Sequence, residues 1–198
     1  MTMFARLDEE TRLLHGEIDR GWRRFLRPQL VTRHDYVRQL CVTYGFEAPF
    51  EAVCAYTRGL QGVIDFHRRA RSGLIAHDLL VLGWRPELIT NLYTYPMAPF
   101  DDAIEALAWM YVVERPALIY GHVRDQLVAQ FPDLAHASRY LTAFAGQGDR
   151  RWAELDAALD QVCTSKVAED RAIAAAKVAS ESLAGWIRSH GPALRIAG

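Results

Sequence analysis

The sequence predicts an all-α fold, a bundle of about eight helices joined by short connections. Three observations lead to this prediction. Apolar residues recur at spacings of three and four along nearly all of the 198 residues, as they do on one face of an α-helix. The alternation typical of β-strands and the Asn-Gly or Asp-Gly turns of hairpins are absent. Proline, glycine and capping residues divide the pattern into segments of helical length.

Helical segments fill the first half of the chain. Pro28 ends the first segment, because proline cannot continue a helix. Thr32 has the side chain and position of an N-cap for the second. Gly45 and Pro49 are expected to break or kink this second helix. The predicted segments are residues 7–26, a helix from about residue 34, an amphipathic stretch over 60–71, and residues 74–82.

The second half continues in the same way. Pro86 suits the first position of a further turn, where its missing N–H costs nothing. Pro116 interrupts a strongly apolar helix and either kinks or restarts it. Gly146 and Gly148 mark a loop. The predicted segments are residues 101–114, 118–131, a short helix from 132, residues 150–162 and residues 167–189.

Composition excludes several classes of protein. The net charge is −1, from 23 basic and 24 acidic residues, so no strongly basic nucleic-acid-binding domain is present. No apolar run approaches the roughly 20 residues of a membrane span. Cys41, Cys54 and Cys163 form no CxxC pair, which favours buried, reduced thiols. We therefore expect one cytoplasmic domain over residues 1–198, with a flexible tail over 190–198 and no nucleic-acid or membrane partner.

One histidine stands out among the seven. No HExxH, ExxH, GxSxG, P-loop or GxGxxG motif is present. His15 lies beside Leu14 and Ile18, and Asp19 follows one turn later on the same helix face. An imidazole on a core-facing helix can ligate a heme iron while an acidic neighbour holds the ring through its other nitrogen. A local hydrogen bond between His15 and Asp19 is the simpler alternative.

The stretch Thr11-Arg-Leu-Leu-His15-Gly-Glu-Ile-Asp19 resembles the N-terminal pattern of bacterial biliverdin-producing heme oxygenases, whose histidine is the proximal iron ligand. Residues 36–51, 69–83 and 106–114 are similar to later patterns of that family, in the same order. A loop before Trp152 and an Ala-rich last helix with Trp186 complete the resemblance. It spans almost the whole chain and implies a heme-oxygenase-like fold, with His15 as ligand of the heme iron.

The sequence departs from that family in one place. There, a glycine-rich run forms the distal helix, whose backbone passes close over the heme and orients O₂. Here the run reads Arg115-Pro116-Ala117-Leu118-Ile119-Tyr120-Gly121. Arg115, Ile119 and Tyr120 fill the three glycine positions, and Gly121 stands one place beyond the pair.

Two consequences of this departure stay open. Bulky Ile119 and Tyr120 close the pocket, so that the fold survives without heme. Alternatively, Pro116 and Gly121 bend the helix differently, and Tyr120 or His122 enters the distal side as a second ligand. A second strong ligand would block O₂ and give a sensor or carrier.

The resemblance also implies residues that would hold the heme propionates. Arg12 lies one turn before His15 and is well placed by its spacing. Tyr111 occupies the position of a propionate-contacting tyrosine, and Lys177 matches a basic position of the last helix. Asp8 stands where the family often has a lysine, so one cation is lost.

The function that the resemblance implies is oxidative cleavage of heme to biliverdin, CO and iron, with heme as both cofactor and substrate. Electrons would come from a ferredoxin- or flavodoxin-like donor docked on the arginine cluster Arg68, Arg69 and Arg71. The alternative is a degenerate member that binds heme, another tetrapyrrole or a protein partner without turnover. A third possibility is a thiaminase-like hydrolase of the wider fold, although Cys41 and Cys54 lack a nearby histidine or acid in sequence.

Overall fold

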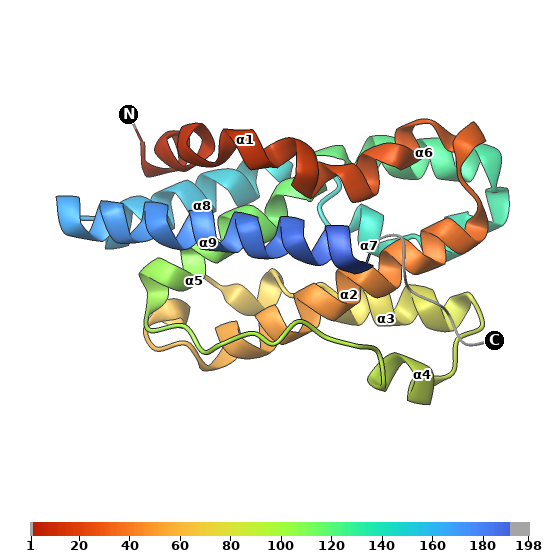
Figure 1. The fold of residues 1–198 in the computed structure, drawn as a ribbon, viewed down its shortest axis with the longest axis horizontal. Helices are drawn as coiled ribbons and strands as arrows, with labels where there is room; N and C mark the ends of the chain where they lie inside the picture. Colours follow the sequence, from red (N-terminus) through yellow and green to blue (C-terminus); the bar gives the residue numbers. More distant parts are fainter. Residues whose placement is uncertain (1, 191–198) are drawn as a thin grey trace.

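The computed structural model describes residues 2–190, and within this range every regular element is helical (Figure 1). The all-α prediction is confirmed, with nine α-helices in the described residues instead of about eight. Residues 191–198 of the expected tail lie outside the described residues, whereas His190 ends the last helix. The α-helices are α1 (Met3–Arg23), α2 (Arg33–Tyr56), α3 (Ser72–Val81), α4 (Pro86–Thr90), α5 (Ala103–Glu114), α6 (Tyr120–Gln130), α7 (Arg139–Thr142), α8 (Gly148–Val162) and α9 (Lys166–His190).

Short 3₁₀ turns join several of these helices. They are η1 (Arg24–Leu26), η2 (Pro28–Leu30), η3 (Leu60–Gly62), η4 (Phe66–Arg68), η5 (Arg115–Ile119) and η6 (Pro132–Ala137). Pro116 restarts the helix as expected, because η5 separates α5 from α6. No helix of the described residues is long and apolar enough to cross a membrane.

Helix α5 forms the centre of the larger apolar core. All residues from Ala106 to Glu114 are buried, because α9 and α8 pack against the helix and Phe4 and Asp8 of α1 contact its Tyr111. Figure 1 shows α1, α8 and α9 running along one another on one side of the molecule, with α2 and α3 on the other. A second apolar cluster fills the opposite end, between α1, α2, α3, α6 and α7, with aromatic residues Trp22, Phe25, Tyr36 and Tyr140 at its centre.

Helix α2 continues unbroken through Pro49, so the break predicted between Gly45 and Pro49 is wrong, whereas the alternative, a kink, stays a prediction. Proline lacks the N–H that would bond the carbonyl of Gly45 four residues earlier. In this fold the N–H of Tyr95 donates to that carbonyl instead, at 2.7 Å. The expected cap is present, since Thr32 and Asp35 form a reciprocal capping box. A tertiary hydrogen bond therefore keeps α2 intact where its own ladder is interrupted.

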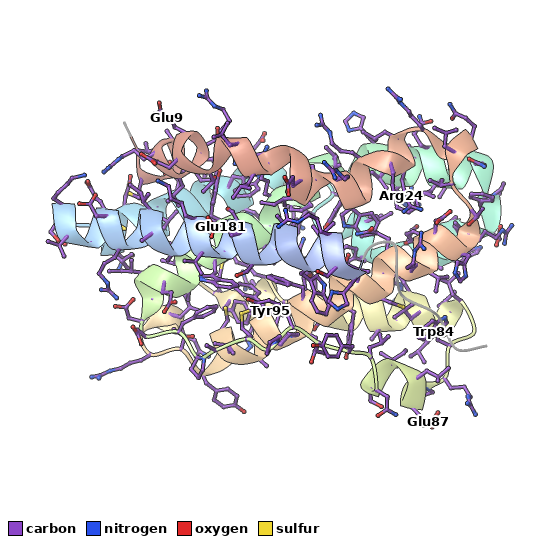
Figure 2. All side chains as sticks on the ribbon, viewed as in Figure 1. Glu9, Arg24, Trp84, Glu87, Tyr95 and Glu181 are labelled. Atoms are coloured by element: carbon purple, nitrogen blue, oxygen red, sulfur yellow. The ribbon has the colours of Figure 1, made fainter. Side chains whose placement is uncertain are left out.

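The segment with Tyr95 crosses the molecule between α4 and α5 and is held in place by polar and aromatic contacts. In Figure 2, Tyr95 lies among the side chains beside α9, whereas Glu9 and Glu87 point outward. The hydroxyl of Tyr95 donates to Ser182 of α9 at 3.0 Å. Its ring packs edge-on to Trp186, whose Nε1 donates to the carbonyl of Val42 in α2 at 2.8 Å.

Residues 60–71 do not form the expected amphipathic helix, and their arginines are not a solvated cluster. Only the two turns η3 and η4 are regular there. Arg68 is exposed, but Arg69 and Arg71 are buried because they pair with Glu114 and Glu47 inside the protein. The charged surface expected to dock an acidic electron donor is thus reduced to one of its three arginines.

We predict that Gly45→Ala destabilises the protein. A Cβ at position 45 would lie 2.6 Å from the carbonyl oxygen of Tyr93 and 2.7 Å from the ring of Trp186, so α2 would have to move away. Such overpacking lowers the free energy of unfolding by about 1–3 kcal/mol. Gly16→Ala is the matched control in α1, because nothing lies within 4 Å of its added Cβ. Urea unfolding of both variants checks this, and equal midpoints would contradict it.

Candidate functional site

His15 lies on the buried stripe of α1, one turn before Ile18 and two turns before Trp22. Its Nε2 is 2.9 Å from the hydroxyl of Thr11, which itself donates to the carbonyl of Leu7 at 2.7 Å. A hydroxyl has one proton, so we assign the second bond to a proton on Nε2 of His15. The nitrogen that would face an iron atom is thereby engaged within α1. The local hydrogen bond expected with Asp19 is formed with Thr11 instead.

Asp8 lies beside His15 and interacts with the polar side chains of Tyr111 and Arg115. The hydroxyl of Tyr111 donates to its Oδ1 at 3.1 Å, and Arg115 Nη1 lies 3.4 Å from the same oxygen. The Nδ1 of His15 is 4.0 Å from that oxygen. Burial and the nearby Asp8 carboxylate raise the pKa of Tyr111 well above its usual range, so Tyr111 stays a neutral hydrogen-bond donor.

Arg115 bridges two carboxylates of α1. Besides Asp8 it approaches Asp19, with 3.8 Å between Nη2 and Oδ2. Burial raises the pKa of Asp19, and Arg115 partly opposes that shift. Burial lowers the pKa of His15, and the positive charge of Arg115 lowers it further. His15 is therefore a neutral imidazole at physiological pH, enclosed by an ion-pair network of α1 and η5.

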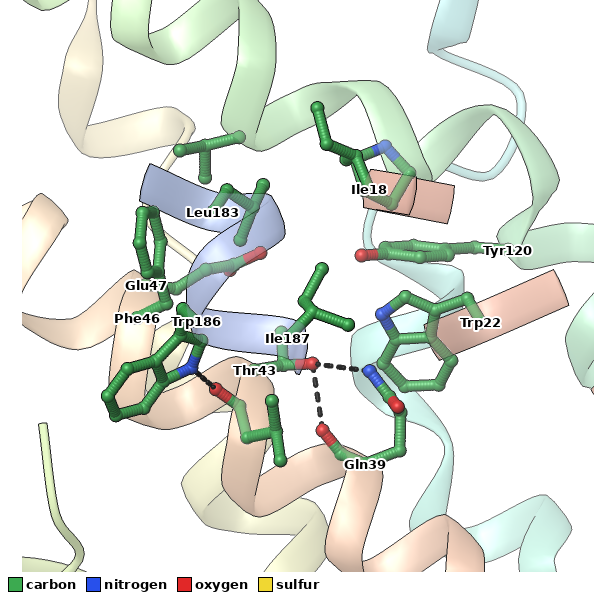
Figure 3. Close-up of a pocket in the computed structure, with 13 residues that line it drawn as sticks. Ile18, Trp22, Gln39, Thr43, Phe46, Glu47, Tyr120, Leu183, Trp186 and Ile187 are labelled. Carbon is green, nitrogen blue, oxygen red and sulfur yellow. Dashed lines mark hydrogen bonds between the residues drawn. The ribbon is translucent and has the colours of Figure 1, made fainter. Parts of the chain in front are cut away.

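A small chamber lies further along α1, where α2, α5, α6 and α9 converge (Figure 3). Its volume is about 30 Å³, enough for one or two water molecules. Its walls are apolar and aromatic, with three polar side chains from α2. The lining residues are Ile18, Trp22, Gln39, Val42, Thr43, Phe46, Glu47, Val113, Pro116, Tyr120, Leu183, Trp186 and Ile187.

Tyr120 closes the chamber on the side of α6. Its ring packs edge-on to Trp22, with 5.2 Å between centroids, and Figure 3 shows its hydroxyl directed into the chamber towards Glu47. The hydroxyls of Tyr120 and Tyr140 are 2.6 Å apart, and Tyr140 donates to Glu47 Oε1 at 2.6 Å. Arg71 donates to the same oxygen at 2.7 Å. A chain of buried hydrogen bonds thus holds Tyr120 in place.

Glu47 is the buried acceptor at the end of this chain. Burial raises its pKa to about 7, and Arg71 opposes the shift. Its second oxygen, Oε2, has no hydrogen-bond partner among the described residues. A charged residue at a core position of an apolar helix was the signal that sequence reasoning could have used to find Glu47. Tyr140 and Arg71 gave no such signal, because their partners are distant in the sequence.

The structure brings some of the expected site residues together and separates others. His15, Asp19, Tyr111 and Arg115 form one polar cluster, and Pro116 and Tyr120 line the chamber. Four of the expected residues lie elsewhere. Arg12 and Lys177 are exposed, and Lys177 pairs with Glu10 at 2.6 Å. Ile119 packs into the second apolar cluster, and Gly121 is exposed with open space around it.

Of the two residues considered as a second heme ligand, Tyr120 points inward, whereas His122 is exposed.

The cysteines do not suit a thiaminase-like hydrolase. Burial raises the pKa of Cys41 to about 12 and that of Cys54 still higher, so neither is a ready thiolate nucleophile. No group of three or more His, Cys, Asp or Glu in the described residues could hold a metal ion.

A heme does not fit this arrangement of side chains. Pockets that enclose ligands of that class measure about 300–1,000 Å³, whereas the chamber measures about 30 Å³. Tyr120 and Trp22 occupy the space between α1 and α6, and Arg115 ties η5 to α1 beside His15. Lys177 is paired with Glu10, so it is not free for a propionate.

Comparison with known proteins places the fold. No family model matches the chain, and no curated protein matches it. A solved structure does match: the NO- and CO-bound heme oxygenase from Neisseria meningitidis, with a TM-score of 0.75 and 18% sequence identity over 100% of this chain and 96% of that chain. At this identity the likeness shows the fold alone. The chain has the fold of a bacterial heme oxygenase.

Proposed function

We propose that this chain has the heme oxygenase fold but does not turn over heme. Its function would be to bind another tetrapyrrole or a protein partner. One observation carries the proposal: Tyr120 fills the space between α1 and α6 and is fixed there by Tyr140 and Glu47. Oxidative cleavage needs a slot that admits the heme beside its proximal ligand, with room for O₂ on the opposite face. The packing of Tyr120 against Trp22 leaves no such slot.

Opening a slot would require several buried groups to rearrange together. Tyr120 would leave Tyr140, His15 would leave Thr11, and Arg115 would leave Asp8 and Asp19. Each hydrogen bond contributes about 0.5–1.5 kcal/mol net, and the buried groups left unpaired add about 1–3 kcal/mol each. Heme binding would have to supply this free energy before any affinity remained. The closed arrangement therefore supports loss of heme turnover.

Heme oxygenase activity is the second candidate function. It is favoured by the likeness of the whole fold to a heme oxygenase and by the position of His15 on α1, facing η5. It requires Tyr120 to swing out of the chamber when heme enters. Hemin binding and turnover separate the two functions.

We predict that hemin added to the parent protein gives no Soret band that depends on His15, and that a reductant yields no biliverdin. Tyr120→Gly removes the ring and its bond to Tyr140, and we expect hemin affinity to rise by about tenfold or more, which corresponds to about 1.4 kcal/mol. Ile119→Gly is the matched control, because Ile119 does not line the chamber. Absorption spectroscopy of the parent, both variants and His15→Ala measures these effects.

The Tyr120 variant loses buried aromatic packing, which costs about 3–5 kcal/mol for comparable truncations. Hemin binding is therefore scored per folded molecule, with Tyr120→Phe as a variant that keeps the ring. A His15-dependent Soret band and biliverdin from the parent protein would overturn the proposal in favour of heme oxygenase activity. Equal hemin affinities for Tyr120→Gly and Ile119→Gly would show that Tyr120 is not the obstruction.

We also predict a stabilising role for neutral His15. Its pKa in the folded protein is lowered by burial and by Arg115, below an ordinary value of 6.5. A lowered pKa means that the contribution to stability is complete above the unfolded pKa and is lost as the pH falls through the folded value. The free energy of unfolding of the parent should therefore fall, relative to His15→Gln, between pH 7.5 and pH 5. Urea titrations at both pH values measure this, and parallel profiles would refute the role.

A further inference from the structure

A groove separate from the chamber lies between η4 and α8, along most of the length of that helix. It is open to solvent and has a volume of about 550 Å³. Four arginines line it, against two carboxylates. The arginines are Arg68, Arg69, Arg150 and Arg151, and the carboxylates are Asp65 and Glu154.

The floor of the groove consists of two buried arginines, each of which donates to a backbone carbonyl of the segment that carries the other. Arg69 Nη2 donates to the carbonyl of Arg151 at 2.6 Å, and Arg151 Nη1 donates to the carbonyl of Arg68 at 3.0 Å. Both guanidinium groups share one buried carboxylate, Glu114, at 2.7 and 3.2 Å. Their positions are therefore fixed before any ligand arrives.

The positive charge of this floor is not fully neutralised. The four arginines of the groove face three carboxylates, because Glu114 pairs with both floor arginines and Glu154 is shared by Arg69 and Arg150. Arg71 adds a further positive charge that acts on Arg151. Burial, together with the charges of Arg69 and Arg71, lowers the pKa of Arg151 to about 10, although Glu114 opposes the shift. The Nε atoms of Arg69 and Arg151 are buried without a partner among the described residues. Negative charge in the groove would compensate this excess.

Two exposed arginines stand at the rim. The side chains of Arg68 and Arg150 are 82% and 65% exposed. Each directs its Nε to a neighbouring carboxylate, Asp65 at 3.0 Å and Glu154 at 3.4 Å. Their terminal nitrogens extend beyond these contacts, and a planar guanidinium group binds oxyanions with two parallel hydrogen bonds.

The N-terminus of helix α8 adds to the positive potential of the groove. Gln147, its N-cap, and Arg150, in its first turn, both line the groove. The N-terminus of this 15-residue helix carries partial positive charge, which adds to that of the arginines.

We propose that this groove binds a small oxyanion with two or more negative charges, of the phosphate or pyrophosphate class. The fixed floor, the two rim arginines and the helix terminus surround one concave space from three sides. An acidic protein surface fits less well, because Arg69 and Arg151 lie at the bottom of the groove, beyond the reach of a flat partner. This proposal is independent of whether the chain binds heme.

Calorimetric titration of the full chain with pyrophosphate, at constant ionic strength, tests the proposal. We expect the double variant Arg68→Ala/Arg150→Ala to bind about tenfold more weakly or worse, because charge-assisted hydrogen bonds are lost. Glu154→Gln should bind several-fold more tightly, because a competing carboxylate near Arg69 and Arg150 loses its charge. Arg85→Ala, at an exposed position beside α4, is the matched control and should bind like the parent.

All three substituted groove residues are half exposed or more, so the variants are expected to fold, and thermal melting without ligand checks this. Failure of the parent to bind pyrophosphate at millimolar concentration would overturn the proposal. Equal affinities for the parent, the double variant and Glu154→Gln would place the anion elsewhere and also overturn it. Binding of an acidic polypeptide, lost in the double variant, without binding of pyrophosphate would replace it with a protein-docking surface.

Discussion

Two buried carboxylates, Glu47 on α2 and Glu114 at the end of α5, are the constraint on which the rest of the structure depends. The chain between α2 and α3 has only two short 3₁₀ turns, so no long helix fixes its course. Arg69 and Arg71 tie this segment to Glu114 and Glu47 at 2.7 Å each. Burying such pairs costs desolvation that the Coulomb attraction only roughly offsets, whereas removing one partner is strongly destabilising. Their main contribution is therefore to specify one arrangement of chain segments that lack regular structure.

The same carboxylates decide what the candidate site can do. Glu47 accepts the hydroxyl of Tyr140, and Tyr140 in turn receives that of Tyr120. The position of Tyr120 between α1 and α6 thus follows from an ion pair on the far side of the chamber. Glu114 has the corresponding role for the arginine groove, because it fixes both guanidinium groups of the floor. The buried network of Glu47 and Glu114 thus closes the chamber through Tyr120 and positions the two buried arginines of the groove.

Local features of the fold could be predicted from the sequence. The cap at Thr32, the turn opened by Pro86 and the restart after Pro116 depend on residues within one or two turns, and all three are confirmed. The continuity of α2 through Pro49 could not be predicted, because the donor that replaces the missing N–H belongs to Tyr95 in a distant segment. The sequence shows that Pro49 removes a hydrogen bond from the helix. Only the tertiary fold shows that the N–H of Tyr95 replaces it.

The arginines of 68–71 were misinterpreted for the same reason. A run of charge is usually a solvated face, and nothing near Arg69 and Arg71 in sequence indicates that their partners lie on α2 and α5. His15 is an intermediate case: a local hydrogen bond was expected, and the structure has one, but with Thr11 on the preceding turn and not with Asp19 on the following one. Asp19 instead forms an ion pair with Arg115, which lies near it only because η5 packs on α1.

These contacts explain how the bundle holds α1 at a fixed distance from η5 and α6 through its own side chains. Arg115 joins η5 to Asp8 and Asp19 of α1, and Tyr120 packs on Trp22 of α1 while Tyr140 of α7 holds its hydroxyl. A bundle whose two walls are joined by its own side chains does not need a ligand to hold them at the right separation. The residues that close the space between α1 and α6 therefore hold the two walls of the bundle together, and His15 stays buried and neutral between them.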